Sequence, residues 1–155
     1  MTCASIMTTD LVTVSPDTTL GSTIRLLTER RFRSIPIVDD SGILLGQFGV
    51  QGVLALGMPH VAAMGLKGPM ADISFVHDNM NDIRRRLSDN WNDPVGDYID
   101  EDSEVLNPED DLTNVMQSLY QSRGNMPVVD PDSGKLVGIV SYWDVLERLF
   151  AGLDA

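Results

Sequence analysis

The sequence predicts a mixed α/β fold in which one β-α-β-β-α unit occurs twice. Two observations support this prediction. Three short blocks recur in the same order at nearly constant spacing, and within each copy strand-like and helix-like segments alternate between turn-forming residues. The chain has 155 residues, of which 43% are hydrophobic. This is enough for one compact domain, or for two small halves that share a core.

The three blocks are clear when the two copies are compared. "TVSPDTTL" recurs as "VLNPEDDL", "SIPIVDDSG" recurs as "NMPVVDPDSG" with one extra residue, and "LLGQFGVQGVLAL" recurs as "LVGIVSYWDVLERL". Pro108 follows Pro16 by 92 positions, and Gly138 follows Gly46 by the same 92. In the middle block Pro127 follows Pro36 by 91 positions, and a nearly constant offset over three ordered blocks indicates an internal duplication.

Each copy opens with a short β-rich run that ends at a proline. The runs are Val12 to Val14 and Val105 to Leu106. We expect the acids that follow, Asp17 and Glu109, in the first turn of a helix, where the helix dipole favours negative charge. The predicted helices carry apolar residues at helical spacing: Leu20, Ile24 and Leu27 in the first copy, and Leu112, Val115, Met116 and Leu119 in the second.

Two strands and a closing helix complete each copy. "IPIVD" and "MPVVD" are typical of buried strands, and a turn rich in Asp, Ser and Gly follows each. A second apolar strand, 43–50 or 136–140, then leads into the closing helix. Because proline donates no hydrogen bond, its early position in each first strand indicates a strand start or a sheet edge.

Residues 58–93 belong to neither copy. From about Asp78 the pattern predicts a helix with Met80, Ile83, Leu87 and Trp91 on one stripe. This insert is either a helical spacer that packs on the body or an arm that binds a partner. We therefore divide the chain into a first repeat (1–57), a helical insert (58–93) and a second repeat (94–155).

Charge and composition exclude several classes of function. The net charge of −12 and the pI of about 4.3 argue against nucleic acid and anionic membranes as partners. No charge occurs between Asp40 and Lys67, but glycines and polar residues interrupt this stretch, so we expect no membrane insertion. Cys3 is the only cysteine, and no signal peptide is recognisable, which predicts a cytoplasmic or similarly reducing location.

No catalytic or metal-binding constellation is evident. His60 and His77 are isolated and have no ligand partners at metal spacing. Nucleophile, phosphate-loop and dinucleotide motifs are absent from the sequence. We expect a binding module that requires no cofactor, and not an enzyme.

The duplicated blocks resemble those of a known family. Each copy combines a "TVSPD"-like entry, a hydrophobe-Pro-hydrophobe-Val-Asp block and an exit of the type "GIVSYWD". This combination resembles a tandem pair of CBS (cystathionine β-synthase) domains, also called a Bateman module. The resemblance covers nearly the whole chain outside the insert.

The resemblance implies both an architecture and a function. The two repeats would pack sheet to sheet about a pseudo-two-fold axis, with two clefts between them that take AMP, ADP, ATP or S-adenosylmethionine. Two modules would pair into a disk-shaped homodimer. The chain would act as a stand-alone sensor that regulates a separate, unidentified protein. The alternative is a ligand-free dimer that serves as a protein-interaction module.

The exit motif of the second repeat supplies the central candidate residues. The resemblance implies that Asp144 holds the ribose hydroxyls, since a carboxylate accepts charge-assisted hydrogen bonds from a diol. Ser141 would contact phosphate at the N-terminus of the closing helix. The same spacing also fits a capping box, although that motif prefers Glu or Gln in the place of Asp144. The two roles are compatible.

The first repeat lacks both groups. Gly49 and Gly52 stand where the second repeat has Ser141 and Asp144. We therefore expect one competent cleft per chain, built mainly on the second repeat.

The resemblance implies further ligand contacts by position. Asn125, Met126 and Pro127 would flank the base and phosphate, and Met126 offers a polarisable wall for a purine. Arg33 would reach across from the first repeat to phosphate, or would simply be a solvated surface arginine. The segment before the second repeat would line the adenine side of the same cleft through Ile99, Asp100 and Glu104.

Overall fold

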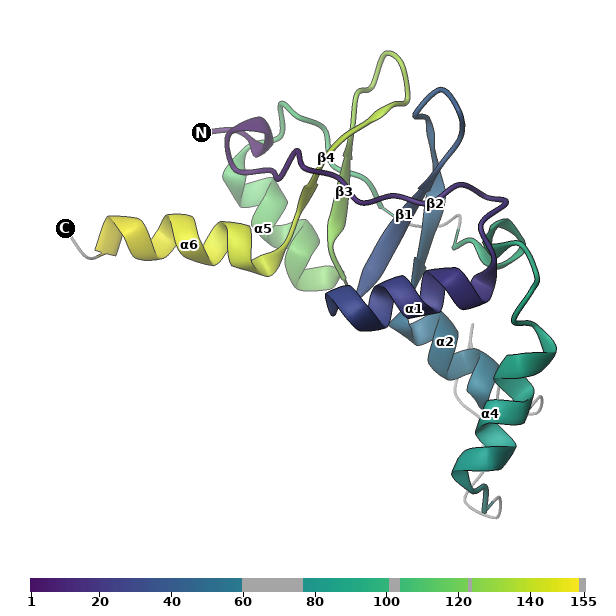
Figure 1. The fold of residues 1–155 in the computed structure, drawn as a ribbon. Coiled ribbons are helices and arrows are strands. Elements are labelled where there is room, and N and C mark those ends of the chain that lie inside the picture. Colours follow the sequence, from purple (N-terminus) through teal and green to yellow (C-terminus); the bar gives the residue numbers. More distant parts are fainter. Residues whose placement is uncertain (60–76, 101–103, 123, 154–155) are drawn as a thin grey trace.

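The computed structural model describes residues 1–59, 77–100, 104–122 and 124–153. In the first repeat, the short helix η1 (Cys3–Ser5) precedes α1 (Leu20–Arg30), β1 (Ser34–Val38), β2 (Leu44–Gly49) and α2 (Val50–Gly57). Between the repeats lies α4 (Met80–Asp89), followed by η2 (Val95–Tyr98) at the start of the second repeat. The second repeat continues with α5 (Leu112–Gln121), β3 (Met126–Val129), β4 (Leu136–Val140) and α6 (Tyr142–Leu153) (Figure 1).

Two antiparallel hairpins form the centre of the molecule. β1 pairs with β2, and β3 pairs with β4. The hairpins lie next to each other (Figure 1), and their tips are joined because Leu44 N donates to Gly134 O at 3.2 Å and Leu136 N donates to Gly42 O at 3.0 Å. The predicted mixed fold with two small packed sheets is therefore confirmed.

Each hairpin has its own hydrophobic core, formed with the helices of its repeat and with a segment from the other repeat. The first core consists of Val14, Leu20, Leu27, Ile35, Ile37, Phe48 and Val95. The second core consists of Cys3, Ile6, Leu106, Val115, Leu119, Met126, Val128, Val140 and Val145. The N-terminus thus belongs to the core of the second repeat, where burial raises the pKa of the Cys3 thiol to about 11.

The opening β-runs are shorter than expected. Val14 makes a single parallel bridge to Ile37, and Leu106 makes the corresponding bridge to Val128. The expectation that acids occupy the first helical turn is wrong. Thr19 caps α1 and Asp111 caps α5, so that Asp17 and Glu109 lie before the helices. These short oxygen-bearing side chains accept from the free N–H groups of the first turn, which fixes where each helix begins.

The segment ahead of each repeat pairs with the sheet of the other repeat. Thr8 exchanges two hydrogen bonds with Ile139 of β4, at 2.8 and 2.9 Å. Asp100 N donates to the carbonyl oxygen of Gln47 in β2 at 3.0 Å. In Figure 1 the N-terminal segment, drawn in purple, crosses both hairpins before it enters α1. Because each of these segments pairs with the sheet of the other repeat, its residues share a cleft with that other repeat.

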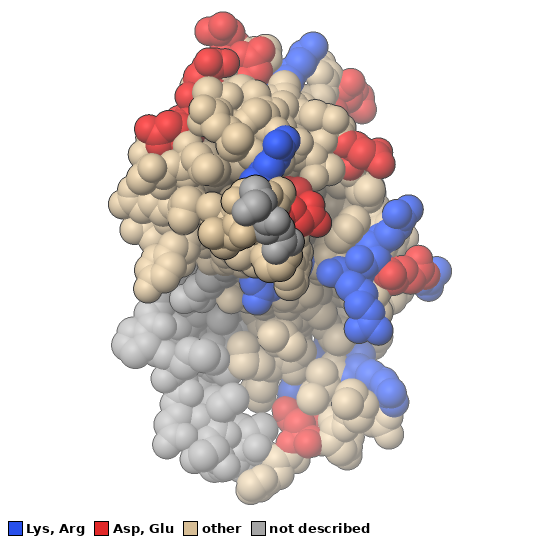
Figure 2. Space-filling model, turned by 90° about the vertical axis from the view of Figure 1, so that its left-hand side faces the viewer, with Lys and Arg blue, Asp and Glu red and all other residues tan. Residues whose placement is uncertain are grey.

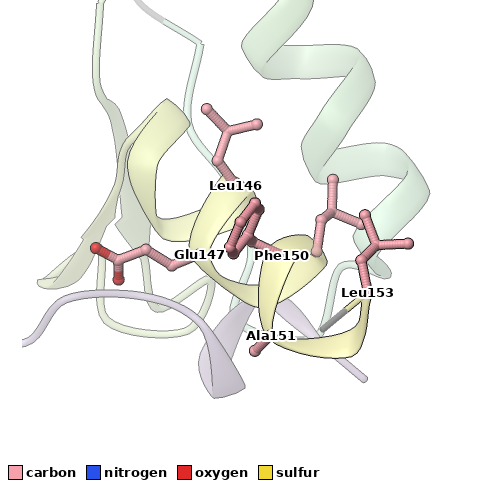
Figure 3. A pocket seen from close by; sticks show the side chains of 6 residues that line it. Leu146, Glu147, Phe150, Ala151 and Leu153 are labelled. Atoms are coloured by element: carbon pink, nitrogen blue, oxygen red, sulfur yellow. The ribbon is translucent and has the colours of Figure 1, made fainter. Parts of the chain in front are cut away.

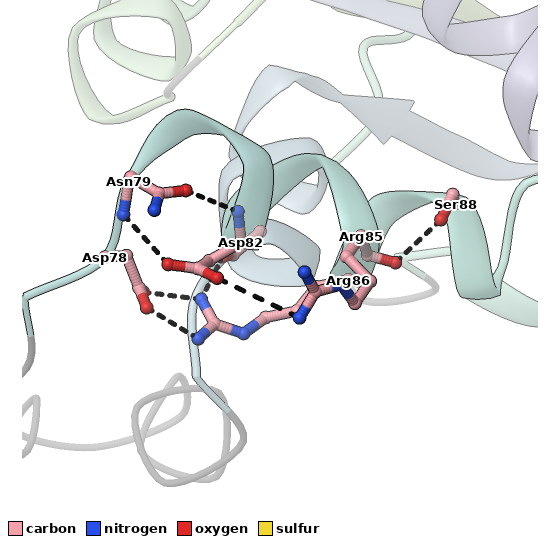
Figure 4. Close-up of polar contacts among 7 residues, drawn as sticks. Asp78, Asn79, Asp82, Arg85, Arg86 and Ser88 are labelled. Atoms are coloured by element: carbon pink, nitrogen blue, oxygen red, sulfur yellow. Dashed lines mark hydrogen bonds and ion pairs between the residues drawn. The ribbon is translucent and has the colours of Figure 1, made fainter.

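The helix predicted in the insert is confirmed as α4, which begins two residues after Asp78. Asn79 and Asp82 form a reciprocal capping box at its start (Figure 4). The guanidinium of Arg86 forms an ion pair with Asp78 at 2.6 Å, and this hydrogen bond lowers the pKa of the Asp78 carboxyl. Arg86 also donates to the carbonyl oxygen of Gly57 at 3.1 Å, which holds α4 against the end of α2.

Part of the insert lies outside the described residues. This applies to residues 60–76, including His60, and so to part of the uncharged stretch between Asp40 and Lys67. Among the helices in the described ranges, none is long and apolar enough to cross a membrane.

Candidate functional site

A pocket of about 180 Å³ lies between the two repeats. Three parts of the chain line it: the N-terminal segment, the start of the first hairpin, and the second repeat around the junction of β4 and α6. The lining residues are Thr8, Asp10, Val12, Phe32, Ser34, Pro36, Asn125, Ile139, Ser141 and Asp144. The structure therefore places Asn125, Ser141 and Asp144, three of the residues expected at the ligand, in one pocket.

Ser141 and Asp144 form a capping box at the start of α6. Ser141 N donates to Oδ2 of Asp144 at 2.7 Å, and Asp144 N donates to Oγ of Ser141 at 3.3 Å. The Ser141 hydroxyl also donates to the same Oδ2 at 3.0 Å. An aspartate is thus long enough to close the box, as Asp82 also shows in α4. Ser141 and Asp144 therefore cap α6, and both residues also line the pocket.

Thr8 connects the N-terminal segment to this box. Its hydroxyl donates to Oδ1 of Asp144 at 3.2 Å. The carboxylate of Asp144 therefore accepts hydrogen bonds at both oxygens, from α6 on one side and from the N-terminal segment on the other. Within the described part of the chain, Oδ1 accepts from this one hydroxyl, which lies on an exposed segment.

Acceptor groups and apolar walls dominate the described lining of the pocket. Asp10 and Asp144 contribute carboxylates, and none of the described lining residues carries a positive charge. Val12, Phe32 and Ile139 contribute apolar surface. Such a lining suits a ligand that has hydroxyl or amino donors and a flat apolar face.

Arg33 lies next to the pocket and reaches the second repeat. Its guanidinium carbon is 5.9 Å from the centre of the Tyr142 ring, within the range of a cation–π contact. The Tyr142 hydroxyl donates to the carbonyl oxygen of Ser122 at 2.9 Å, which fixes the ring. Arg33 is therefore positioned across the boundary between the repeats, at the first residue of α6.

Two expected contacts are instead core residues. Met126 is only 3% exposed, and Pro127 is fully buried. Met126 packs with Val128 in the second core, because alternate residues of β3 point to that side. Of the three residues expected here, Asn125 alone lines the pocket, because it precedes the strand and is partly exposed.

The segment expected on the adenine side lies elsewhere. Asp100 pairs with Gln47 of the first repeat, and the Ile99 side chain lies against Gly46. Glu104 is exposed and does not line the pocket. The expectation that Ile99, Asp100 and Glu104 line the cleft of Asp144 is therefore wrong, because the segments ahead of the repeats are exchanged between the sheets.

Sequence reasoning missed Thr8, Asp10 and Val12. The 92-residue offset contains the signal, since it maps these positions onto Asp100, Asp102 and Glu104. The duplication thus indicates correctly that the segment ahead of a repeat lines a cleft. Which of the two sheets each of these segments pairs with depends on long-range hydrogen bonds, and the local sequence pattern does not encode them.

The first repeat has no room for the missing exit-motif side chains. A Cβ atom at Gly49 would lie 2.6 Å from the carbonyl oxygen of Arg33. At Gly52 it would lie 2.7 Å from the ring of Phe48. α2 begins at Val50 without a side-chain cap, so the closing helix of a repeat forms without the hydroxyl and the carboxylate.

Comparisons with known proteins support the duplication and the fold. CBSX2, a chloroplastic CBS domain-containing protein of Arabidopsis thaliana, is 25% identical over 138 residues, which are 88% of this chain and 58% of that protein. The gamma subunit of the 5'-AMP-activated protein kinase of Saccharomyces cerevisiae is 27% identical over 130 residues, 83% of this chain and 34% of that protein. The chain thus spans a little over half of the first relative and about a third of the second.

Solved structures show the same fold. The crystal structure of CBSX2 from Arabidopsis thaliana matches with a TM-score of 0.76 at 22% identity, covering 99% of this chain and 97% of that one. A structure of CBSX2 in complex with AMP matches with a TM-score of 0.70 at 24% identity, covering 97% and 96%. The family model for the CBS domain matches residues 3–56 and again residues 95–151. The chain therefore belongs to the CBS domain family, as a tandem pair of these domains.

Proposed function

We propose that this chain is a regulatory module that binds one adenosine nucleotide in the pocket of Thr8, Ser141 and Asp144 and thereby modulates a partner protein. The observation that carries the proposal is the convergence of Ser141, Asp144 and Asn125 with the N-terminal segment in one pocket between the repeats. The AMP complex of CBSX2 and the name of the yeast AMP-activated kinase subunit support the ligand class.

The ribose binds to Asp144. Its Oδ2 stays in the capping box, while a ribose hydroxyl takes the place of Thr8 as the donor to Oδ1. Thr8 is then released from α6, which couples ligand occupancy to the position of the N-terminal segment. A ligand changes the protein only through such a difference in contacts between the two states.

The phosphate lies at the start of α6. The free N–H groups of this 12-residue helix and the Ser141 hydroxyl are suitable donors to an anion. Arg33 leaves the ring of Tyr142, or extends over it, to pair with the phosphate. Because Asp10 and Asp144 repel each added phosphate charge, the pocket favours AMP over ADP and ATP. S-adenosylmethionine, which carries a positive charge, is the alternative that the two carboxylates favour.

The proposal includes a homodimer and a separate regulated protein in a cytoplasmic or similarly reducing compartment. We assign no catalytic activity and no required cofactor to the chain. Regulation then consists of a ligand-dependent change in how the repeats and the two copies contact one another.

Thermal unfolding with AMP, ADP, ATP and S-adenosylmethionine tests the proposal. A ligand at about 100 times its Kd stabilises the folded state by roughly 2.7 kcal/mol. We expect the largest increase in melting temperature with AMP. If none of the four ligands raises the melting temperature, the proposal is wrong.

The variant Asp144→Ala tests the assigned site. It removes the ribose acceptor, and it also removes a capping interaction that is worth about 1 kcal/mol. Asp82→Ala is the matched control, because it removes the corresponding acceptor from the capping box of α4, outside the pocket. We expect both variants to melt earlier, and only Asp144→Ala to lose the AMP-induced shift. A shift that persists in Asp144→Ala would place the nucleotide elsewhere.

A further inference from the structure

The positive charge of this acidic chain is concentrated in one segment. Over the whole chain, 11 Lys and Arg residues stand against 23 Asp and Glu residues. Between Asp17 and Asp39 there are four arginines and one acid, Glu29, so this segment has a formal charge of +3 in a chain of net charge −12. Figure 2 shows Lys and Arg side chains gathered on the right-hand side of the molecule, with most of the visible acids above them. The four arginines are Arg25, Arg30, Arg31 and Arg33.

The arginines at the end of α1 differ in their contacts from those elsewhere. Outside this segment, every arginine of the described ranges makes a polar side-chain contact: Arg84 with Asn81, Arg85 with Asp82, Arg86 with Asp78, and Arg148 with the carbonyl oxygen of Ser5. Arg30 and Arg31 are exposed, and neither forms an ion pair or a side-chain hydrogen bond within the described part of the chain. Contacts inside the fold therefore do not explain why these two positions are arginine.

The backbone of Arg31 favours glycine. α1 ends at Arg31 with φ 56° and ψ 38°, the left-handed conformation in which helices commonly end on glycine. Arg31 is the one residue other than glycine with positive φ in the described ranges. A side chain in this conformation costs free energy that glycine would not cost. The helix dipole favours a cation at this end, but Arg30 already supplies one in the last turn. An unfavourable backbone conformation thus supports a role for the Arg31 side chain.

The same loop lines the candidate pocket. Phe32 and Ser34 line the pocket, and the residues that alternate with them, Arg31 and Arg33, are exposed. The guanidinium of Arg33 reaches across to the aromatic ring at the start of α6. We call Arg30, Arg31 and Arg33 the arginine surface. A group that binds there contacts the loop whose other side chains line the pocket.

We propose that the arginine surface binds an acidic segment of the regulated partner protein, and that the nucleotide phosphate competes with this segment for Arg33. The inference rests on the proposed function, which includes the partner and the phosphate. Guanidinium groups suit carboxylates because their paired N–H donors match the two carboxylate oxygens. Without nucleotide, all three arginines are available to the partner. With nucleotide bound, Arg33 pairs with the phosphate and the partner keeps two, so that nucleotide weakens the partner complex.

Charge favours a short acidic protein segment over other anionic partners. Nucleic acids and anionic membranes carry negative charge over distances much larger than three neighbouring arginines, and the remaining surface of a chain with net charge −12 repels them. A segment of a few Asp or Glu residues ends within the arginine surface. At physiological salt, exposed charges beyond about 8 Å are largely screened, so the acids elsewhere on the chain oppose such a segment little.

The hollow along α6 does not suit an acidic partner. This hollow has a volume of about 590 Å³, and its described lining is apolar except for Glu147. Figure 3 shows Leu146, Phe150 and Leu153 among the side chains that line it. An acidic segment in this hollow would meet apolar side chains and a like charge. The arginine surface offers it opposite charges instead.

Fluorescence anisotropy with a labelled decaglutamate peptide at roughly 50 mM salt tests the surface. We expect saturable binding to the natural chain. The double variant Arg30→Ala/Arg31→Gly should bind at least about tenfold more weakly, because it loses two of the three cations. Arg84→Ala/Arg85→Ala is the matched control, since it removes two exposed cations from α4. The control should keep the Kd within about twofold of the natural value.

The single variant Arg31→Gly separates binding from folding. Glycine adopts the left-handed conformation without a side-chain penalty, so we expect the melting temperature to rise by roughly 2–4 °C. The Kd for decaglutamate should nevertheless weaken at least about threefold. A variant that is more stable and binds the peptide as tightly as the natural chain would show that Arg31 is not part of the surface, and would overturn the inference.

Three other results would overturn it as well. The first is a natural chain without saturable binding of decaglutamate. The second is an Arg84→Ala/Arg85→Ala control that loses as much affinity as Arg30→Ala/Arg31→Gly. The third is tighter binding of a labelled thymidine decanucleotide, or of phosphatidylserine vesicles, than of the peptide, which would assign the surface to nucleic acid or to a membrane.

Addition of AMP tests the competition for Arg33. At an AMP concentration that saturates the thermal shift, the Kd for decaglutamate should weaken at least about threefold. An unchanged Kd in the presence of an AMP-induced thermal shift would overturn the competition. If AMP causes no thermal shift while peptide binding still depends on Arg30 and Arg31, the nucleotide site is wrong and the arginine surface stands as the partner site.

Discussion

At the scale of single residues, one carboxylate serves two purposes. Asp144 closes the capping box of α6 through Oδ2 and accepts from Thr8 through Oδ1, inside the candidate pocket. α2 begins without either side chain, which shows that the duplicated architecture does not require the cap. The presence of Ser141 and Asp144 in the second repeat alone is therefore the strongest residue-level support for a ligand there.

Restoring the exit motif in the first repeat should damage the protein and create no second site. In Gly52→Asp, the new Cβ would meet the Phe48 ring at 2.7 Å, and Phe48 belongs to the first core. We expect a loss of about 1–3 kcal/mol, typical of overpacking, in urea unfolding. A variant as stable as the natural chain would show that Phe48 moves aside and that the first cleft is more adaptable than its contacts indicate.

Tyr98 predicts a pH dependence at the alkaline end. Burial, together with the hydrogen bond that its hydroxyl donates to Asp93 at 2.6 Å, raises the pKa of Tyr98 from 10.0 to about 12. Below pH 10 the phenol is protonated in both the folded and the unfolded chain, and its contribution to stability is complete. Between pH 10 and 12 the unfolded chain ionises first, so this contribution is lost as the pH rises.

Comparison with Tyr98→Phe isolates this effect from other alkaline titrations. We expect the difference in melting temperature between the natural chain and the variant to be constant below pH 10 and to shrink between pH 10 and 12. A difference that stays constant over the whole range would contradict the raised pKa.

At the scale of elements, local patterns predicted most helices and strands, and nonlocal pairing decided the rest. Both hairpins, both closing helices and α4 follow from periodicity and turn residues. The helix starts were misplaced because Thr19 and Asp111, and not the earlier acids, satisfy the free N–H groups. The sequence predicts only some of the residues that line the pocket. Ser141, Asp144 and Asn125 belong to a recognisable motif, whereas Thr8 and Asp10 enter through a segment exchange that involves distant residues.

The packing of α1 depends on a close contact with the end of the insert. Gly21 N donates to the carbonyl oxygen of Trp91 at 2.9 Å, and a Cβ atom at Gly21 would overlap the Trp91 indole. We expect Gly21→Ala to cost about 1–3 kcal/mol despite the better helix propensity of alanine. Gly152→Ala in α6 is the control, since nothing lies within 4 Å of its added Cβ atom.

Gly21→Ala should lower the urea midpoint, and Gly152→Ala should not. Gly152→Ala should keep or raise the midpoint, because alanine is favoured over glycine in a helix by up to about 1 kcal/mol. Equal midpoints for both variants would mean that the Trp91 ring yields, and that the insert is attached less firmly to α1 than this contact suggests.

At the scale of the whole molecule, two folding units with the same order of helices and strands differ chemically. The second repeat keeps the hydroxyl and the carboxylate, and the first has glycines against the Arg33 carbonyl oxygen and the Phe48 ring. The helical faces differ as well, because α4 covers the end of α2 while α6 stays exposed. The second repeat carries both the pocket and the bare face.

This asymmetry predicts the stoichiometry of nucleotide binding. Isothermal titration with AMP should give one bound nucleotide per chain, because Gly52 stands in the first repeat where the second has Asp144, the proposed ribose acceptor, and a side chain in place of Gly49 or Gly52 has no room. Asp144→Ala should remove the heat signal, and Asp82→Ala should preserve both the signal and the ratio of one. A ratio of two would show that the first cleft holds ribose without a carboxylate. Two sites would also make the loss of the motif in the first repeat irrelevant to binding. A ratio of one-half would place a single nucleotide on the two-fold axis of a dimer, where the pocket of each chain would be only half a site.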